Sequence, residues 1–411
     1  IICLILCCAI LFQSYRSDII EYSMPYGSKL IDMGYVPDIV LRFGVIALLQ
    51  SRLDLYHNLT KTNKLELYVN DFVKDLKSRK SIAEETLKAN EQHYEVDTRF
   101  YNYVLGYHKK YSSCIYLTPK EVQQEMYDKP PNNSLSYYTQ SKDMALESLN
   151  IAEVHMLDLY VKRAKLCTDK SSKVGCALNV LDLGCGWGSF SLYYAGLCKK
   201  CQIRAVSNSE TQIEYINNEA KKRGYKNLKA IRVNMNNIDK LTDKIGDINK
   251  FDRIISIEML EHMKNYQKLF QSLSNVLKPN GLMFAHIFEH KQMPYHFEVN
   301  YESDWMSKHF FTGGTMPSTN LFKKFNDHLQ VVDYWKVNGI HYSHTLESWL
   351  YIMDSNKNDI KPVLGEIYGN NDESITIWWN RWRVFFIACS ELFRYNNGNE
   401  WYVGHYLLKP K

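Results

Sequence analysis

The chain has 411 residues, and 45% of them are hydrophobic, which is enough for a packed core in one large domain or two smaller ones. Lys and Arg number 50 against 45 Asp and Glu, and the resulting net charge of +5 is too mild to indicate a nucleic-acid-binding surface. The ten cysteines are dispersed without framework spacing, so reduced thiols in a cytosolic protein are expected. Cys198 and Cys201 form one CxxC pair with no second pair or His cluster nearby, and no metal site is predicted.

The chain opens with an apolar run, Ile1 to Phe12, that is too short to span a bilayer. This run could be the end of a longer anchor, which would attach a cytoplasmic protein to a membrane, or an interfacial or artefactual end. Four regions follow from the composition of the chain: 1–30 apolar segment, 31–140 helical cap with an insertion, 141–290 core, and 291–411 aromatic cover with the last strands.

Helical, amphipathic patterning runs from Met33 to about Lys77 and predicts an N-terminal cap without reactive groups. His93 and Tyr94 then stand in a segment dense in polar and aromatic residues, which would suit the lid of a substrate pocket. The abundance of Tyr in this chain explains the pair equally well. The polar stretch Leu117 to Gln140, with two adjacent prolines, is predicted to be a surface loop or insertion.

The stretch VLDLGCGWGSF, residues 180–190, predicts a buried strand, a tight turn and a helix. Gly184, Gly186 and Gly188 allow backbone N–H groups to approach a ligand at a helix N-terminus, and Asp182 adds a carboxylate beside the turn. The GxGxG spacing differs from the GxGxxG of dinucleotide folds, and the chain has no GxxxxGK[ST] phosphate loop. A glycine turn next to an acid suits S-adenosylmethionine, a nucleoside with an amino-acid tail; a purely structural turn is the alternative.

Strands and helices alternate after this turn, and this alternation predicts a doubly wound, mostly parallel α/β sheet. Ligands of such sheets bind beyond the carboxyl ends of the strands. The predicted elements are strands at 203–206, 230–233, 251–257 and 282–287, with helices at 211–223 and 266–277.

Candidate cofactor contacts follow the second and third strands. Neutral hydrogen-bonding groups after the second strand suit a ribose, although a helix cap would explain Ser207 or Asn208 equally well. Amides and a methionine after the third strand suit an adenine. The candidates are Ser207, Asn208 and Gln212 on the ribose side, and Asn234, Met235 and Asn236 on the adenine side.

The fourth strand ends in a cluster of acids and a histidine, in FDRIISIEMLEHM. Ile257 is a further candidate cofactor contact, and if a helix begins near Glu258, then Glu258, Glu261 and His262 share one face. Two carboxylates and an imidazole can hold a cationic amine and remove its proton. Acids favoured in a first helical turn are the alternative explanation. His286, in the fifth strand, is either a core residue or part of the pocket wall.

The region after the fifth strand is rich in Trp, Tyr and Phe and is expected to cover the site. It contains the turn FFTGGTMPS, a helix that starts at NGIHY and an aromatic helix before the last strand. The aromatic candidates for the substrate pocket are Phe310, Tyr342 and Phe385.

Taken together, the chain resembles the cyclopropane-fatty-acid synthase and coclaurine N-methyltransferase branch of the class I methyltransferases. The matching motifs include VPDIVLRFG, ANEQHYEV, KYSSCIY, VLDLGCGWGSFSLY, SNSETQ, FDRIISIEMLEHMKNY, FFTGGTMPS, FFIACSELF and YNNG. FFTGGTMPS is closer to the N-methyltransferases than to the lipid synthases. The resemblance implies a Rossmann-like fold, S-adenosylmethionine as cofactor and a small, isoquinoline-like amine as substrate.

The resemblance also implies roles for single residues. Tyr111 falls where the family contacts the methionine end of the cofactor, and Gly184 and Gly186 line its amino-acid moiety. The acids Glu258 and Glu261, together with the neighbouring His262, match positions assigned to acid–base work on the substrate amine.

Methylation or cyclopropanation of phospholipid acyl chains is the rival function that the resemblance leaves open. The lipid synthases hold a bicarbonate ion with a Cys, a Glu, a His and a Tyr. Glu261 and His286 keep two of these positions, whereas Ser113 replaces the Cys and Phe385 replaces the Tyr. The altered ion site counts against a lipid substrate, and the apolar N-terminus counts for membrane contact.

Overall fold

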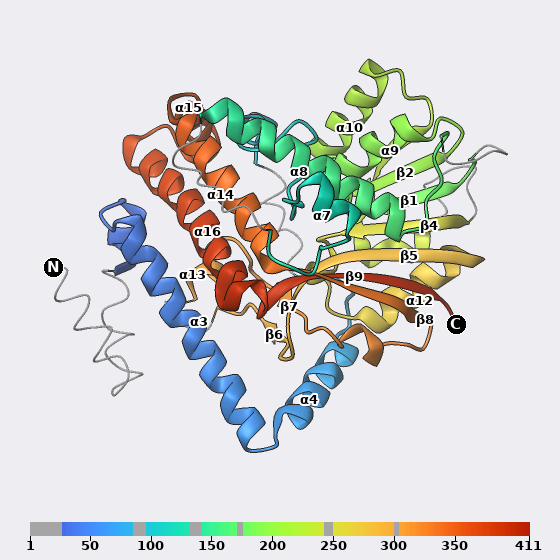
Figure 1. Ribbon diagram of the computed structural model, residues 1–411, viewed down its shortest axis with the longest axis horizontal. Helices are drawn as coiled ribbons and strands as arrows, with labels where there is room; N and C mark the ends of the chain where they lie inside the picture. The colour runs from blue at the N-terminus through green and yellow to red at the C-terminus, as the bar shows by residue number, and fades with distance from the viewer. Residues whose placement is uncertain (1–26, 85–95, 132–140, 171–175, 242–249, 300–303) are drawn as a thin grey trace.

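The computed structural model describes residues 27–84, 96–131, 141–170, 176–241, 250–299 and 304–411 (Figure 1). The apolar run Ile1 to Phe12 and the pair His93 and Tyr94 lie outside these residues, so the predictions made for them stay predictions. Among the described helices, none is both long and apolar enough to cross a membrane.

A seven-stranded sheet in the order β3-β2-β1-β4-β5-β9-β8 forms the centre of the fold. Strands β1 to β5 pair in parallel, whereas β9 runs antiparallel to both β5 and β8. The predicted doubly wound, mostly parallel sheet is therefore confirmed. Its strands are β1 (Asn179–Leu183), β2 (Gln202–Ser207), β3 (Leu228–Arg232), β4 (Phe251–Ile257), β5 (Leu277–His290), β8 (Leu329–Val337) and β9 (Trp401–Pro410), with a small separate sheet of β6 (Tyr295–His296) and β7 (Thr315–Met316).

Strand β1 shows why the sequence folds in this way. Its residues alternate between the two apolar cores: Val180 packs into one, and Leu181 and Leu183 pack into the other. A strand with both faces covered needs a continuous apolar run, which is what the sequence provides. The chain moves outward from β1 to β3 and then returns to β4 beside β1, so the topological switch point lies between β1 and β4.

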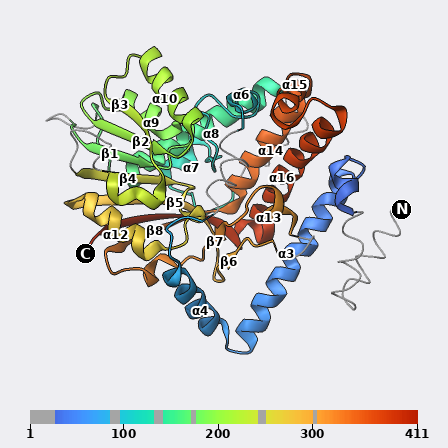
Figure 2. The ribbon, with the colours of Figure 1, turned by 180° about the vertical axis from the view of Figure 1, so that it is seen from behind.

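Helices flank this sheet and extend beyond it on the side of the N-terminal cap and the aromatic cover (Figures 1 and 2). The helices predicted at 211–223 and 266–277 are present, whereas the helices at 98–104, 305–309 and 357–368 were not predicted. Most of the described helices lie outside the segment 117–140. They are α3 (Asp38–Lys61), α4 (Leu65–Ser78), α6 (Thr98–Val104), α8 (Lys142–Arg163), α9 (Ser189–Leu197), α10 (Glu210–Lys222), α12 (Tyr266–Val276), α13 (Trp305–His309), α14 (Gly339–Ser355), α15 (Lys357–Tyr368) and α16 (Asp372–Gly398), with 3₁₀ turns η3 (Met235–Lys240), η4 (Leu260–His262) and η5 (Phe322–Lys324).

The N-terminal cap and the C-terminal cover are joined to each other. Helix α3 lies alongside α16 in both views (Figures 1 and 2). The Arg42 guanidinium on α3 donates to Glu347 on α14 and to Glu391 on α16, each at 2.6 Å. Both carboxylates are buried. A charged triad therefore fixes the first described helices to the last ones.

The segment Leu117 to Gln140 was predicted to be a surface loop or insertion, but it is not a plain loop. It begins with helix α7 (Pro119–Gln123), which starts at a capping box in which Thr118 and Glu121 bond to each other's backbone. Thr118 followed three residues later by Glu121, with Pro119 at the first helical position, was the signal for this helix. Residues 132–140 lie outside the described part of the chain.

Candidate active site

A cavity lies at the carboxyl ends of the central strands and is closed by the cap and the cover. Most residues predicted for the site line this single cavity, although they come from distant parts of the sequence. They are Tyr111, Asp182, Gly184, Gly186, Ser207, Asn208, Gln212, Met235, Ile257, Glu258, Glu261, His262, Tyr342 and Phe385.

The glycine turn after β1 adopts backbone conformations that other residues avoid. Gly184 has φ of 78°, and a Cβ there would lie 2.3 Å from the Met259 side chain. Gly186 has φ of 52°, and a Cβ would meet nothing within 4 Å, because the turn is open toward the cavity at this point. Gly188 does not line the cavity and instead starts helix α9 with φ of 74°. The turn thus offers an open backbone cradle beside the strand.

Asp182 lies below this cradle and is buried. Its carboxylate accepts a hydrogen bond from the Ser191 hydroxyl at 2.5 Å. Burial raises the pKa of Asp182 to about 7. A buried acid that is close to half-ionised at neutral pH is stabilised as a carboxylate when a cationic group comes near it.

Polar groups after β2 face the same cavity. The Ser207 hydroxyl donates to the Gln212 amide oxygen at 2.7 Å. The N-cap of α10 is Ser209, so the helix-cap explanation of Ser207 and Asn208 is wrong. Ser207, Asn208 and Gln212 stand where a ribose could bond with them.

The asparagines after β3 are not among the residues that line the cavity, and their side chains bond to the backbone of the protein itself. That they flank an adenine stays a prediction. Asn234 caps the short helix η3 by accepting from the Asn236 backbone at 2.9 Å. The Asn236 amide bonds to the backbone of Ala83 in two directions, at 2.9 and 3.0 Å. These residues fix the N-terminal cap to the core, and Met235 between them remains as a cavity-lining residue.

Glu258 is held by three donors. Its carboxylate accepts from the Ser113 backbone N–H at 3.1 Å, from His286 Nε2 at 2.9 Å and from the Tyr342 hydroxyl at 2.5 Å. The Glu258 backbone has φ of 45°, so no helix begins here, contrary to prediction, and only the 3₁₀ turn η4 follows. Glu258, Glu261 and His262 nevertheless all line the cavity.

His286 lies behind Glu258 and does not line the cavity, so it belongs to the core. Its Nδ1 lies 2.9 Å from both the Tyr160 hydroxyl and His405 Nε2. Burial lowers the pKa of His286 to about 4, so the ring is neutral at physiological pH. A neutral imidazole that donates through Nε2 orients Glu258 without adding charge.

Glu261 differs from Glu258 because its carboxyl group accepts no hydrogen bond from the described residues. Its carboxyl group is fully buried, and neither oxygen has a hydrogen-bond partner among the described residues. Burial, together with the negative charge of Glu258, raises the pKa of Glu261 well above its usual range. An unsatisfied buried acid beside a charged one is a site that a ligand cation would stabilise.

Aromatic rings form the remaining wall. Phe311 lies beside the His262 ring, with centroids 4.9 Å apart, and Tyr342 stacks on Phe393 at 4.2 Å. Phe310 was predicted to line the pocket, but it is buried behind Phe385 and stacks on it at 4.5 Å. Ser113 also stays outside the cavity lining and contributes its backbone N–H to Glu258.

Several lining residues were missed by the sequence analysis. Lys110 precedes the predicted Tyr111. Burial lowers the pKa of its amine, and Nζ donates to the Ser113 carbonyl oxygen at 2.7 Å. Phe311 directly follows the predicted Phe310. Both stand inside motifs that the sequence analysis quotes, but a motif alone does not show which of its side chains face the cavity. Trp349 had no motif, and only the spacing along its helix from Tyr342 could have indicated it.

The strand order, the glycine turn and the acids after β4 define an S-adenosylmethionine-dependent class I methyltransferase. The family profile described as mycolic acid cyclopropane synthetase matches residues 82–402. The chain therefore belongs to this family. The open glycine cradle beside Asp182 fits the amino-acid end of S-adenosylmethionine, which is the cofactor.

Within this family, plant N-methyltransferases are similar over nearly the full length. An (S)-coclaurine N-methyltransferase of Thalictrum flavum subsp. glaucum is 33% identical over 93% of this chain and 95% of its own. That of Papaver somniferum is 35% identical over 72% and 80%. A crystal structure of coclaurine N-methyltransferase with N-methylheliamine and SAH is 30% identical, with a TM-score of 0.77 over 94% of this chain and 99% of that one. By contrast, the cyclopropane-fatty-acyl-phospholipid synthase of Escherichia coli K12 matches 46% of this chain at 28% identity.

Proposed function

We propose that this methyltransferase transfers the methyl group to the nitrogen of a small, partly aromatic amine such as a tetrahydroisoquinoline. The observation that carries the proposal is the unpartnered carboxyl of Glu261 beside the fixed carboxylate of Glu258, in a cavity walled by aromatic rings. This arrangement suits a cation with an apolar body. The similarity to the two (S)-coclaurine N-methyltransferases supports the same substrate class.

The cofactor supplies an electrophilic methyl group, and the protein has to supply a neutral amine. A free amine is mostly protonated at neutral pH and has no lone pair for attack. In the proposal, the Glu258 and Glu261 carboxyls hold the substrate ammonium, and the approach of that cation favours ionisation of Glu261. His262 removes the proton, which in general contributes roughly 10²–10⁴-fold to the rate.

Positions of the cofactor contacts are also part of the proposal. Tyr111 would contact the methionine end, and Gly184 and Gly186 would line its amino-acid group with their backbone. Ser207, Asn208 and Gln212 would bond to the ribose side. Each of these residues lines the cavity, which supports the assignments.

Lipid methylation is the second candidate, and one contact argues against it. The resemblance assigns the positions of Ser113 and His286 to a bicarbonate ion in the lipid synthases. In this chain both groups donate to the Glu258 carboxylate, so a protein carboxylate already uses them. Contact of residues 1–30 with a membrane remains a prediction, because 1–26 lie outside the described residues.

A methylation screen tests the proposal. The full chain is incubated with methyl-labelled S-adenosylmethionine and either a panel of secondary and tertiary amines, including tetrahydroisoquinolines, or vesicles of unsaturated phospholipid. Mass spectrometry then identifies the labelled product. Label on nitrogen that is lost in Glu261→Gln supports the proposal, whereas label confined to acyl chains refutes it.

A further inference from the structure

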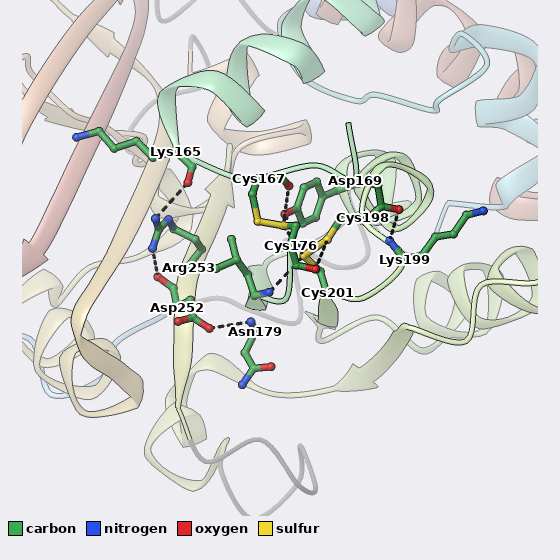
Figure 3. The surroundings of a disulfide bond; sticks show 12 residues. Lys165, Cys167, Asp169, Cys176, Asn179, Cys198, Lys199, Cys201, Asp252 and Arg253 are labelled. Atoms are coloured by element: carbon green, nitrogen blue, oxygen red, sulfur yellow. Dashed lines mark hydrogen bonds between the residues drawn. A yellow bond between two sulfur atoms is a disulfide. The ribbon is translucent and has the colours of Figure 1, made fainter. Parts of the chain in front are cut away.

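Four cysteines converge on one point of the fold (Figure 3), and none of them lines the active-site cavity. The sulfur atoms of Cys167, Cys176, Cys198 and Cys201 all lie within 4.8 Å of one another. The structure joins them as two disulfides, Cys167–Cys176 and Cys198–Cys201. The expectation that the CxxC pair has no second pair nearby is therefore wrong, and the structure shows these four cysteines oxidised where reduced thiols were expected. We propose that in the reduced protein these four cysteines bind one structural zinc ion.

The arrangement of the sulfurs supports a metal. In a tetrahedral zinc site with Zn–S bonds of about 2.3 Å, the sulfurs are about 3.8 Å apart. Here Cys176 Sγ lies 3.3 Å from Cys201 Sγ, across the two disulfide pairs. Two separate disulfides need no such approach of one pair to the other, whereas a single ion needs all four ligands around one centre. Three of the four cysteines are buried, which also suits a closed site.

One neighbouring group points a hydrogen-bond donor at a sulfur of the cluster. The Leu178 backbone N–H donates to Cys201 Sγ at 3.4 Å. The Tyr194 hydroxyl donates to the Cys167 carbonyl at 2.8 Å and lies 3.3 Å from the same sulfur. In the same part of the fold, the Arg253 guanidinium donates to the Lys165 carbonyl (Figure 3). A backbone donor to a ligand sulfur lessens the negative charge of a thiolate centre.

The position of the cluster indicates a structural role. Cys167 follows α8, Cys176 precedes β1, and Cys198 and Cys201 lie in the connection from α9 to β2. The ion would therefore join the amino ends of β1 and β2, whereas the cavity lies at their carboxyl ends. None of the four cysteines lines the cavity. Four thiolate ligands leave no open position for substrate, so the ion would stabilise the sheet without taking part in catalysis.

Zinc binding here moves protons but no electrons. Each of the four thiols loses its proton as its sulfur bonds to Zn²⁺, so affinity rises with pH. A centre of four sulfurs also suits iron, but the absence of redox chemistry in the proposed reaction favours zinc. Oxidation to the two disulfides would remove two electrons for each bond formed and would release the ion.

Metal analysis of the intact chain tests the proposal. The full chain is produced in zinc-containing medium, purified under a thiol reductant and measured by native mass spectrometry and elemental analysis. One zinc per chain is expected, together with four extra thiols titrated in denaturant after the ion is chelated. Cys176→Ser and Cys198→Ser should each lose the ion, and Cys389→Ser, outside the cluster, should keep it.

A spectroscopic measurement covers the case in which a serine variant fails to fold. Wild-type chain in which Co²⁺ replaces zinc should show the intense thiolate charge-transfer and visible bands of tetrahedral Co–S₄. A metal-free chain under reductant, a chain whose mass is lower by four hydrogens under the same reductant, or iron in place of zinc would each overturn the proposal. None of these results depends on the methyl acceptor.

Discussion

His286 Nε2 lies 2.9 Å from the Glu258 carboxylate, and the Tyr342 hydroxyl lies 2.5 Å from its other oxygen. The two donors come from a core strand and from the aromatic cover, so the position of Glu258 depends on how these two parts of the chain pack together. Because Glu258 lines the cavity, a displacement of either donor would also move a carboxylate of the active site.

Removal of the Tyr342 hydroxyl should impair turnover more than binding. Tyr342→Phe keeps the ring stacked on Phe393 but removes a hydrogen bond to a carboxylate, a contact worth roughly 1.5–3 kcal/mol, so kcat should fall about 10- to 100-fold. Steady-state kinetics with the amine found in the screen measures this, and the affinity for S-adenosylhomocysteine should not change. Tyr351→Phe on the same helix is the control and should keep its kcat. An unaltered kcat in Tyr342→Phe would show that Glu258 needs no such support.

The outcome at Glu258 also shows the limit of what could be predicted. Alternating apolar runs were enough to place β1 to β5 and most helices, because burial sets those patterns locally. The positive φ of Glu258 and the turn of Asn236 toward Ala83 arise from tertiary contacts and leave no trace in the periodicity. The same holds for the four cysteines, because Cys176 and Cys198 are in contact in space but are 22 positions apart in the sequence.

His262 should be needed for the chemical step and not for cofactor binding. His262→Ala removes the proposed base, so turnover at pH 7 should fall roughly 10²–10⁴-fold. Calorimetric titration with S-adenosylhomocysteine should give an affinity close to that of wild type. His57→Ala, at an exposed position of α3, is the matched control. Wild-type turnover in His262→Ala would refute the assignment of His262 as the base.

Glu261 should make the protein less stable as the pH rises. Its pKa is raised above the value of 4.5 that it takes in the unfolded chain, so the folded state binds this proton more tightly. The resulting stabilisation is present below pH 4.5 and is lost as the pH rises through the raised pKa. Glu261→Gln cannot ionise and should have a higher Tm than wild type at pH 8, with a smaller difference at pH 5.

Thermal unfolding of both proteins across this pH range checks the sign. Asp182 and Glu289, whose pKa values burial raises to about 7, contribute equally to both curves, so the difference reports Glu261 together with its interaction with Glu258. The same variant should lose turnover. Equal Tm values at pH 8 would mean that Glu261 is not an unsatisfied buried acid with a raised pKa.

The Arg42 triad should be a large contributor to stability. Arg42→Met leaves the buried Glu347 without its cation and Glu391 with only the more distant Arg394, at 3.6 Å. Removal of one partner of a buried ion pair typically costs about 3–5 kcal/mol of unfolding free energy. Denaturant unfolding monitored by tryptophan fluorescence measures this loss. Because α3 is held to α14 and α16 through this contact, limited proteolysis should also cut first within the N-terminal cap. Arg52→Met on the same helix lacks these partners and should cost much less.

Gly184 should be essential for the cofactor cradle. Gly184→Ala places a Cβ 2.3 Å from Met259 at φ of 78°, so the side chain of Met259 or the turn has to move. A non-glycine residue in this conformation costs roughly 1–2 kcal/mol before the clash is counted. Affinity for S-adenosylhomocysteine, measured by calorimetry, should fall more than tenfold. Gly44→Ala tests whether the effect is specific, because a Cβ at Gly44 meets nothing within 4 Å and the helical site should gain about 0.5–1 kcal/mol. If Gly184→Ala bound the ligand as tightly as Gly44→Ala, the turn after β1 would not be the cofactor cradle.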